Sequence, residues 1–400
     1  MSTSLLYHRF GLRGPFHYRS TSYVKNVTIF NIAHNAHFKC PECRSHKVIK
    51  KGTKTRSFLA TPIGLNPSVL RINHQRIYCH KCSFIGYLPL NFVPKEKVRY
   101  TKNFEQYVLS LLRQNITILS VAKLCHVCWD TVKDIQKRYL KKRYHRPSLK
   151  DVTHIGIDEI YCGAKTGYMT VVIDMKTSAV IYTEKGKKAA SLDAFWLHKN
   201  KCKKPIEAVA TDMGNAYISS VKKHAPDARL VIDRFHVVKL FNDKLTTFRR
   251  QLQNELTEKT DRTFLKNTRW LLVSNPENLN DSGQVKLNNA LSLNKPLATM
   301  YYLKEKLRML WTLPSKEAAE KWLINWFSEA ESADIPILKT MTKTLRKHRV
   351  GILAYYDEKM SSGKVEGVNN RIKTINKMAY GYRDLAFFEL KIKASHEARY

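Results

Sequence analysis

Two sets of side chains in the sequence are of types that bind metal ions, and the first is a set of cysteines. Four of the eight cysteines form two Cys-x-x-Cys pairs, Cys40 with Cys43 and Cys79 with Cys82. Paired thiolates on two tight turns are the usual ligands of a tetrahedral structural zinc ion. We therefore expect these four residues to bind one Zn²⁺; the alternative is that they are unpaired core thiols.

The second set consists of carboxylates. Asp158 lies in the apolar run HIGIDEIYC, and Asp212 ends the run IEAVATDM. If these runs are adjacent strands, the two carboxylates converge, and a divalent cation such as Mg²⁺ or Mn²⁺ relieves their repulsion. Glu366 is the candidate for a third ligand. Two ions held by three acids would activate water or a 3′-hydroxyl for in-line attack on a phosphodiester.

Each acid also has a purely structural explanation. An Asp at a strand end often caps a turn, and a Glu in a first helical turn complements the helix dipole.

The helical period of KVEGVNNRIKTINKM places Glu366 on one side with Asn370, Lys373 and Lys377. A metal-binding carboxylate followed by an amide and two amines on one face is typical of a surface that contacts DNA.

The elements that must position these acids read as an α/β segment. Three short strand runs are followed by helix, strand, helix and strand, and this βββαβαβ order is that of an RNase H-like catalytic core, in which the first and fourth strands are neighbours. Asp233 and His236 follow the fifth strand near the same edge. They are candidate accessory residues, as a metal ligand or proton handler, or as positioning and helix-start residues.

The charge balance indicates a polyanionic partner. The chain has 400 residues, with 70 Lys and Arg against 33 Asp and Glu, a formal net charge of +37. The basic residues are spread along the chain, which favours nucleic acid bound by several folded faces. A membrane surface is the competitor, but no apolar run approaches the roughly 18 residues of a spanning helix, and the start lacks an apolar signal core. A soluble, intracellular protein is expected.

The region before the α/β segment contains two candidate DNA-binding parts. Strand-like stretches such as VLRINHQRIYC separate the cysteine pairs and predict a zinc ribbon. The loop between the pairs offers basic residues for phosphate contacts, unless they only solubilise the domain. These residues are Lys50, Lys51, Lys54, Arg56, Arg71 and Arg76.

The stretch FEQYVLSLLRQ is apolar at helical spacing, and SVAKLCHVCWDTVKDIQKRYL then reads as helix, turn, helix. Asp130 and Thr131 open the second of these helices, whose end carries Lys137 and Arg138 as candidate DNA contacts. Plain helix packing is the alternative. Cys125 and Cys128 have no second pair nearby and are interpreted as core residues of this hairpin.

A long helical stretch follows the α/β segment. Four tryptophans at helical spacing suit its core better than stacking on flipped bases. They are Trp270, Trp311, Trp322 and Trp326.

Several strings of the sequence resemble the ISL-three family of bacterial insertion-sequence transposases. They are IGIDEI, TDMGNAY, VIDRFHVVKLFND and KVEGVNNRIKTINKMAYGYRD. The resemblance covers nearly the whole chain. It implies that Asp158, Asp212 and Glu366 are the DDE catalytic triad. It also implies that the partners are double-stranded DNA with terminal inverted repeats and the target DNA. By analogy it also implies a homodimer on paired ends and a bacterial, nucleoid-associated protein of the cytoplasm.

We therefore expect an α/β protein of five segments. These are a zinc-ribbon domain over 1–97, a helix-turn-helix domain over 98–148, the first part of the catalytic core over 149–239, a helical insertion over 240–360, and the core helix with Glu366 over 361–400. The predicted function is that of a DDE transposase, which cuts and joins DNA with two metal ions. A DNA-binding regulator without catalysis and an RNase H-like nuclease are the alternatives.

Overall fold

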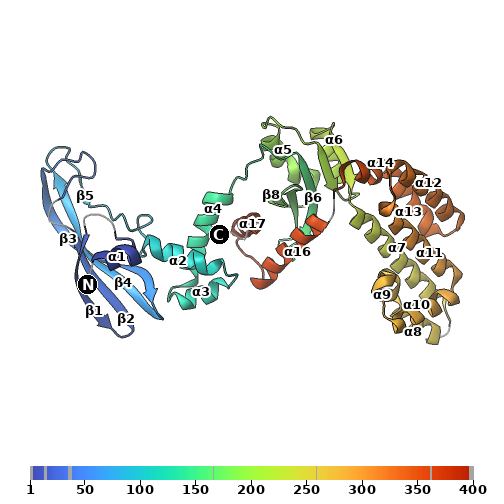
Figure 1. The fold of residues 1–400 in the computed structure, drawn as a ribbon, viewed down its shortest axis with the longest axis horizontal. Coiled ribbons are helices and arrows are strands. Elements are labelled where there is room, and N and C mark those ends of the chain that lie inside the picture. Colours follow the sequence, from blue (N-terminus) through green and yellow to red (C-terminus); the bar gives the residue numbers. More distant parts are fainter. Residues whose placement is uncertain are drawn as a thin grey trace. The chain divides into compact units, whose positions relative to one another are not determined.

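The computed structural model describes residues 3–12, 16–34, 38–164, 166–257, 259–360 and 363–395. They form two compact units, one through His145 and one from Arg146. The first is blue to teal and the second green to red in Figure 1. The finer division into five segments stays a prediction. Among the described residues, no helix has the length and apolar character needed to cross a membrane.

The first unit begins with helix α1 (Thr3–Phe10) and contains a five-stranded sheet. The strands run in the order β1-β2-β4-β3, β5 pairs with β4, and β2 is parallel to β4. Their bounds are β1 Phe16–Val24, β2 Val27–His34, β3 Val48–Ile63, β4 Asn66–Cys79 and β5 Ile85–Tyr87. The segment between the cysteine pairs is therefore a long hairpin. The basic residues expected in a loop, including Lys54 and Arg71, lie on its two strands instead.

Alternation along the hairpin explains its packing. Phe58 of β3 and Leu70 of β4 face each other in register and are fully buried, together with Phe10 of α1 and Phe92. Side chains of the alternate positions, such as Ser57 and Arg71, are exposed. One face of the hairpin therefore contributes to a small apolar core, and the other presents polar and basic groups to solvent.

Two histidines are buried in this sheet. The rings of His34 and His74 stack 5.9 Å apart, and His74 Nε2 lies 2.6 Å from the Leu88 carbonyl oxygen as its donor. Burial lowers the pKa of His34 to about 4 and also lowers the pKa of His74. Both rings are therefore neutral in the folded protein at physiological pH.

We expect mild acid to destabilise this unit. In the unfolded chain His34 takes up a proton near pH 6.5, but in the folded protein only near pH 4, so between these values the unfolded state binds more protons. The contribution of His34 to stability is complete above pH 6.5 and is lost as the pH falls, by about 2 kcal/mol at pH 5. Urea unfolding of the native chain and of His34→Phe at pH 7 and pH 5 measures this. An equal pH dependence in both proteins would contradict the assignment.

Three helices complete the first unit: α2 (Lys102–Leu112), α3 (Ile118–Leu124) and α4 (Trp129–Tyr144). The side chains of Thr101 and Thr117 cap the first two helices. Their common core contains Val108, Val121 and Val132. This is the predicted helix-turn-helix arrangement.

The two cysteines of this hairpin differ in their surroundings. Cys125 is buried in the core as expected, and burial raises the pKa of its thiol to about 11. The expectation that Cys128 is a core residue is wrong. Cys128 is exposed because it is the residue before the first turn of α4, where its sulfur lies 3.0 Å from the Thr131 hydroxyl.

The second unit is built on a mixed sheet with the strand order β10-β9-β6-β7-β8. The sheet pairs β6 antiparallel to β7, and β7 antiparallel to β8, whereas β9 is parallel to both β6 and β10. Helix α5 (Asp193–Lys199) precedes β9 and α6 (Asn215–His224) precedes β10. The strands are β6 His154–Tyr161, β7 Tyr168–Asp174, β8 Val180–Lys185, β9 Ala208–Thr211 and β10 Arg229–Ile232.

Helices cover both faces of this sheet. Ile155 and Ile157 of β6 pack against α5 and α6, including Trp196. The opposite face, with Ile160 of β6, packs against α16 (Gly363–Met378) and α17 (Leu385–Ala394). Because successive residues of a strand point to opposite faces, Gly156, Asp158 and Ile160 all lie on the face that packs against α16. Figure 1 shows α16 beside β6. The sheet thus presents Asp158 to the helix that carries Glu366.

The segment between β10 and α16 is helical, as expected, and most of its helices share one large apolar core, to which Ile218 of α6 and Ile232 of β10 also contribute. Its helices are α7 Arg234–Glu255, α8 Lys259–Asn267, α9 Arg269–Val273, α10 Asp281–Leu293, α11 Lys295–Arg308, α12 Lys316–Ser332, α13 Pro336–Lys347, α14 Arg349–Leu353 and α15 Tyr355–Glu358. Trp311 and Trp326 are buried and Trp322 packs against this core, but Trp270 is 68% exposed beside Arg269. The expectation that Trp270 is a core residue is therefore wrong, because it lies on the outward side of the short helix α9 (Arg269–Val273).

Candidate active site and DNA-binding elements

Parallel pairing brings three aspartates to one edge of the second sheet. Gly156 of β6 is in register with Ala210 of β9, so two residues further on Asp158 is level with Asp212. Ile232 of β10 is in register with Thr211, which places Asp233 beside Asp212. Asp158 and Asp212 have the same parity and so lie on the same face of the sheet.

The Asp158 carboxylate is held on both oxygens. Its Oδ1 accepts a hydrogen bond of 2.8 Å from the Glu159 backbone N–H and lies 3.7 Å from His236 Nε2. Its Oδ2 accepts a hydrogen bond of 2.6 Å from Asn369 Nδ2. Burial raises the pKa of Asp158, and the nearby Asp212 adds to this effect, whereas His236, the backbone N–H and Asn369 oppose it. These are the surroundings of a carboxylate that gains from a nearby cation.

Asp212 follows directly after β9 and is partly exposed. Its Oδ1 accepts a hydrogen bond of 2.9 Å from the Gly214 backbone N–H, the residue before helix α6. The space beside this carboxylate is tight, because a Cβ on Gly214 would lie 2.8 Å from Oδ1. A side chain at position 214 would therefore displace the acid.

Helix α16 lies directly on β6 because Gly156 has no side chain. A Cβ at this position would come within 2.9 Å of Val365. Val365, Val368 and Ile372 are buried, and this apolar stripe turns Asn369 toward Asp158. Glu366 is exposed and lies one turn before Asn369.

The exposed stripe of α16 agrees with the helical spacing in the sequence, since Asn370, Lys373 and Lys377 are exposed together with Glu366.

The carboxylates of the three candidate acids do not meet at one position in this structure. Within the described part of the chain, Asp158, Asp212 and Glu366 do not form a group whose oxygen atoms lie together as metal ligands do. The role of Glu366 stays a prediction.

Asp233 and His236 lie at the start of α7. Asp233 is the N-cap residue of this helix, and its Oδ1 accepts a hydrogen bond of 2.9 Å from the Phe235 backbone N–H. The same carboxylate is 3.9 Å from His236 Nε2, which in turn faces Asp158. The two residues therefore link α7, the first helix of the segment between β10 and α16, to the candidate site.

Sequence reasoning missed two residues of this site. Asn369 donates the shorter of the two hydrogen bonds to Asp158, whereas the helical spacing in the sequence points to its exposed neighbour Asn370. Its position among Val365, Val368 and Ile372 on the buried face was the available signal. The second is Glu159, whose pKa is raised by burial and by the charges of Asp212 and Asp158.

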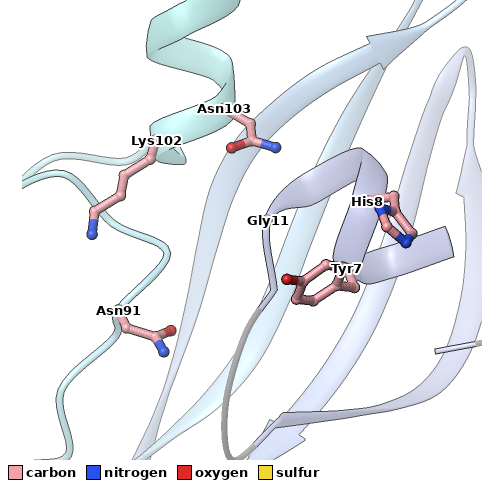
Figure 2. Close-up of a pocket in the computed structure, with 6 residues that line it drawn as sticks. All are labelled: Tyr7, His8, Gly11, Asn91, Lys102 and Asn103. Carbon is pink, nitrogen blue, oxygen red and sulfur yellow. The ribbon is translucent and has the colours of Figure 1, made fainter. Parts of the chain in front are cut away.

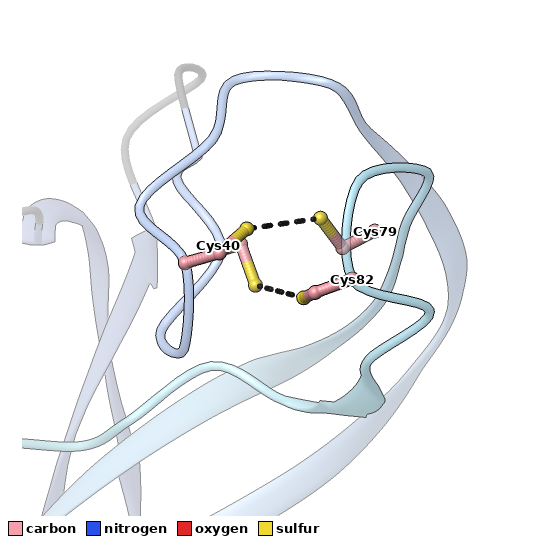
Figure 3. A group of neighbouring side chains, drawn as sticks. Cys40, Cys79 and Cys82 are labelled. Atoms are coloured by element: carbon pink, nitrogen blue, oxygen red, sulfur yellow. Dashed lines mark hydrogen bonds between the residues drawn. The ribbon is translucent and has the colours of Figure 1, made fainter.

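The four cysteines of the first unit form a metal-binding group, as predicted. Cys40 and Cys82 have their sulfurs 3.5 Å apart, as do Cys43 and Cys79. All four sulfurs lie within 4.8 Å of one another, and Figure 3 shows two chain segments approaching the cluster. Tetrahedral Zn–S bonds of about 2.3 Å separate sulfurs by nearly the same distance, so the set fits a structural Zn²⁺.

The two cysteine turns have the same backbone geometry. Arg44 and Ser83, which follow the second cysteine of each pair, have φ angles of 57° and 58°. Their N–H groups donate to the carbonyls of Cys40 and Cys79, at 3.0 and 2.9 Å. The backbone itself therefore positions both thiol pairs.

The two residues predicted to contact DNA from the helix-turn-helix are not fully exposed. Lys137 and Arg138 are both partly buried on α4. The guanidinium of Arg138 forms an ion pair with Glu105 of α2 and donates a 3.0 Å hydrogen bond to the Tyr100 hydroxyl. Arg138 thus holds α4 against α2.

We expect Arg138→Ala to lower stability more than Lys137→Ala does. Glu105 keeps only 15% of its side chain exposed, so loss of Arg138 leaves a partly buried carboxylate unpaired and costs roughly 1–3 kcal/mol. Thermal unfolding and DNA binding of the two variants separate packing from phosphate contact. Equal melting temperatures would contradict a structural role for Arg138.

A separate cavity of about 480 Å³ lies in the first unit between α1, α2 and the segment near residue 91 (Figure 2). Its lining is mostly polar and includes none of the candidate site residues. The lining residues are Tyr7, His8, Gly11, Asn91, Lys102 and Asn103. We assign it no role in the chemistry.

Three family profiles match the chain, each over a different range of residues. The transposase profile of the ISL3 family matches residues 155–392. The helix-turn-helix domain of transposase family ISL3 matches residues 95–140, and the zinc-finger of transposase IS204/IS1001/IS1096/IS1165 matches residues 36–82. The fold, the zinc cluster and these matches define a transposase.

Similar proteins of known name agree. The chain is 31% identical over 360 residues to the transposase for insertion sequence element IS1001 of Bordetella parapertussis, covering 89% of this chain and 88% of that protein. It is 28% identical over 291 residues to the transposase for insertion sequence element IS1557 of Mycobacterium tuberculosis, covering 66% and 65% of the two chains. The protein belongs to the ISL3 family of insertion-sequence transposases.

Proposed function

We propose that the protein cuts DNA at the ends of its insertion sequence and joins the freed 3′-hydroxyl to target DNA, with Asp158, Asp212 and Glu366 as the catalytic acids. The observation that carries this proposal is the level placement of Asp158 and Asp212 on adjacent parallel strands, on the face covered by α16. Glu366 enters because it lies one helical turn from Asn369, which contacts Asp158.

The core is proposed to be RNase H-like. Three antiparallel strands followed by helix, strand, helix and strand, with the first and fourth strands adjacent, support this assignment. The helical segment between β10 and α16 is then an insertion into the core.

Two Mg²⁺ or Mn²⁺ ions would be held by Asp158 and Asp212, with Glu366 as the third acid. The donor types suit such ions, because hard cations prefer carboxylate oxygens. The Oδ1 of Asn369, buried without a protein partner among the described residues, leaves a further hydrogen-bond acceptor beside them. When bound, these ions polarise the phosphate and lower the pKa of the attacking hydroxyl. The chain itself fixes Asp158 through Glu159 and Asn369 and places His236 beside it.

DNA binding is proposed for three surfaces. Helix α4 of the helix-turn-helix enters the major groove, and the hairpin β3–β4 offers exposed Lys50, Lys51, Lys54 and Arg71 to phosphates. The stripe of Asn370, Lys373 and Lys377 holds the scissile strand beside Glu366. The substrate is double-stranded DNA with terminal inverted repeats, bound as paired ends by a homodimer.

The test is a cleavage assay with the purified protein. Duplexes carrying the inverted repeats that flank its gene, and scrambled duplexes of equal length, are incubated with Mg²⁺, Mn²⁺ or Ca²⁺. We expect cleavage only of the end-containing duplex and only with Mg²⁺ or Mn²⁺. Binding without cleavage in every metal would favour a regulator that only binds DNA, and equal cleavage of branched DNA or RNA–DNA hybrids would favour a nuclease.

A further inference from the structure

Asn369 is the least expected residue at the candidate site. It is 8% exposed, its Nδ2 donates to Asp158 Oδ2 at 2.6 Å, and its Oδ1 is buried without a hydrogen-bond partner among the described residues. The amide orientation follows from chemistry, because turning it round would place the Oδ1 acceptor against a carboxylate oxygen. The amide nitrogen is thus bonded to Asp158, whereas the amide oxygen has no hydrogen-bond partner among the described residues.

The position of Asn369 on α16 explains how this arises. It lies at the border between the buried side of the helix, with Val365, Val368 and Ile372, and the exposed side, with Glu366. For packing alone a leucine would suit this position, since a buried carbonyl without a partner is destabilising. The amide therefore points to a ligand on the side of Asp158.

We propose that Asn369 is a positioning residue for the divalent cation: its Nδ2 fixes the Asp158 carboxylate, and its Oδ1 accepts a hydrogen bond from a water molecule that the cation carries. This inference rests on the proposed function and deepens it. Partners of ligating carboxylates orient the ligand and commonly change metal affinity by about 10–100-fold when removed.

The geometry around Asp158 shows what the amide contributes. The Glu159 backbone N–H and His236 Nε2 both lie against Oδ1, at 2.8 and 3.7 Å, whereas Asn369 is the group that holds Oδ2. Without the amide donor Oδ2 is free to turn, so the coordination of a bound cation should change as well as its affinity.

Mn²⁺ binding to the full-length protein without DNA, measured by titration calorimetry and electron paramagnetic resonance at neutral pH, tests this. We expect Asn369→Leu to weaken Mn²⁺ binding about 10–100-fold and to change the resonance spectrum of the bound ion, with a melting temperature equal to or above the native value. Asn289→Ala, an exposed helical asparagine of α10 (Asp281–Leu293), is the matched control and should change neither.

Native Mn²⁺ affinity and a native resonance spectrum in Asn369→Leu would overturn the inference, and so would a loss of binding that appears only together with a lower melting temperature. If the leucine variant does not fold, Asn369→Ser is judged by the same two measurements. Asp158→Asn separates the two proposals: if it leaves Mn²⁺ binding unchanged, the proposed function fails and takes this inference with it. If Asp158→Asn abolishes binding and Asn369→Leu does not, only the inference fails.

Discussion

Asp158→Asn and Asp212→Asn are expected to abolish strand cleavage while DNA-end binding stays at the native level. The two carboxylates are the oxygen donors that adjacent parallel strands bring level with each other. An amide in place of either removes a negative charge from the cation site, and a loss of roughly a thousand-fold is the scale seen when one preorganised electrostatic group is removed. Single-turnover cleavage of an end-containing duplex measures the rate, and gel-shift titration measures binding.

The stability of these variants distinguishes a lost charge from a damaged fold. Because burial already raises the pKa of Asp158, a neutral residue there should keep or increase the melting temperature. Asp227→Asn, on the exposed turn before β10, is the control and should cleave normally. Cleavage by Asp158→Asn at even a tenth of the native rate would contradict its assignment as a catalytic acid.

Removal of zinc is expected to unfold the cysteine end of the first unit and to weaken specific DNA binding. Structural zinc contributes about 10–16 kcal/mol to folding in isolated zinc fingers, which is as large as the whole stability of a typical domain. Chelation, or Cys40→Ser, should therefore release one zinc per chain, lower the β-sheet signal in circular dichroism, and weaken end binding at least tenfold.

A matched control for the zinc experiment is Cys202→Ser. This cysteine lies in the second unit, and its thiol donates a hydrogen bond of 3.7 Å to the His198 carbonyl oxygen. The variant should retain zinc and DNA binding. Full end binding by a chelated, zinc-free protein would show that the cluster does not support the DNA-binding surface.

Much of the fold follows from local patterns in the sequence. The period-two runs around Asp158 and the alternating run that ends at Cys79 are strands, and the Cys-x-x-Cys spacing by itself defines two turns of equal geometry. The adjacency of β6 and β9 was predictable from the βββαβαβ order of elements, because that order in an RNase H-like core places the first and fourth strands side by side.

Other features depended on tertiary contacts that no local pattern encodes. Arg138 has the spacing of a DNA contact, but Glu105, more than thirty residues away, pairs with it. Trp270 is a large apolar residue of the type found in cores, yet it lies on the solvent-facing side of its helix. Asn369 and Asn370 are identical in type and adjacent, and only the packing of α16 on Gly156 determines which of them meets Asp158.

The helical segment between β10 and α16 is anchored to the sheet at its C-terminal end, and this affects the order in which the protein can fold during synthesis. Its last short helix, α15 (Tyr355–Glu358), returns to the sheet, where Glu358 pairs with Arg229 of β10 and with His154 of β6, at 3.1 Å for the histidine. The strands bearing Asp158 and Asp212 emerge from the ribosome long before α16. A nascent chain therefore contains the strands of the sheet before Glu366 has been made, and the proposed active site can be completed only after the whole helical segment between β10 and α16 has been synthesised.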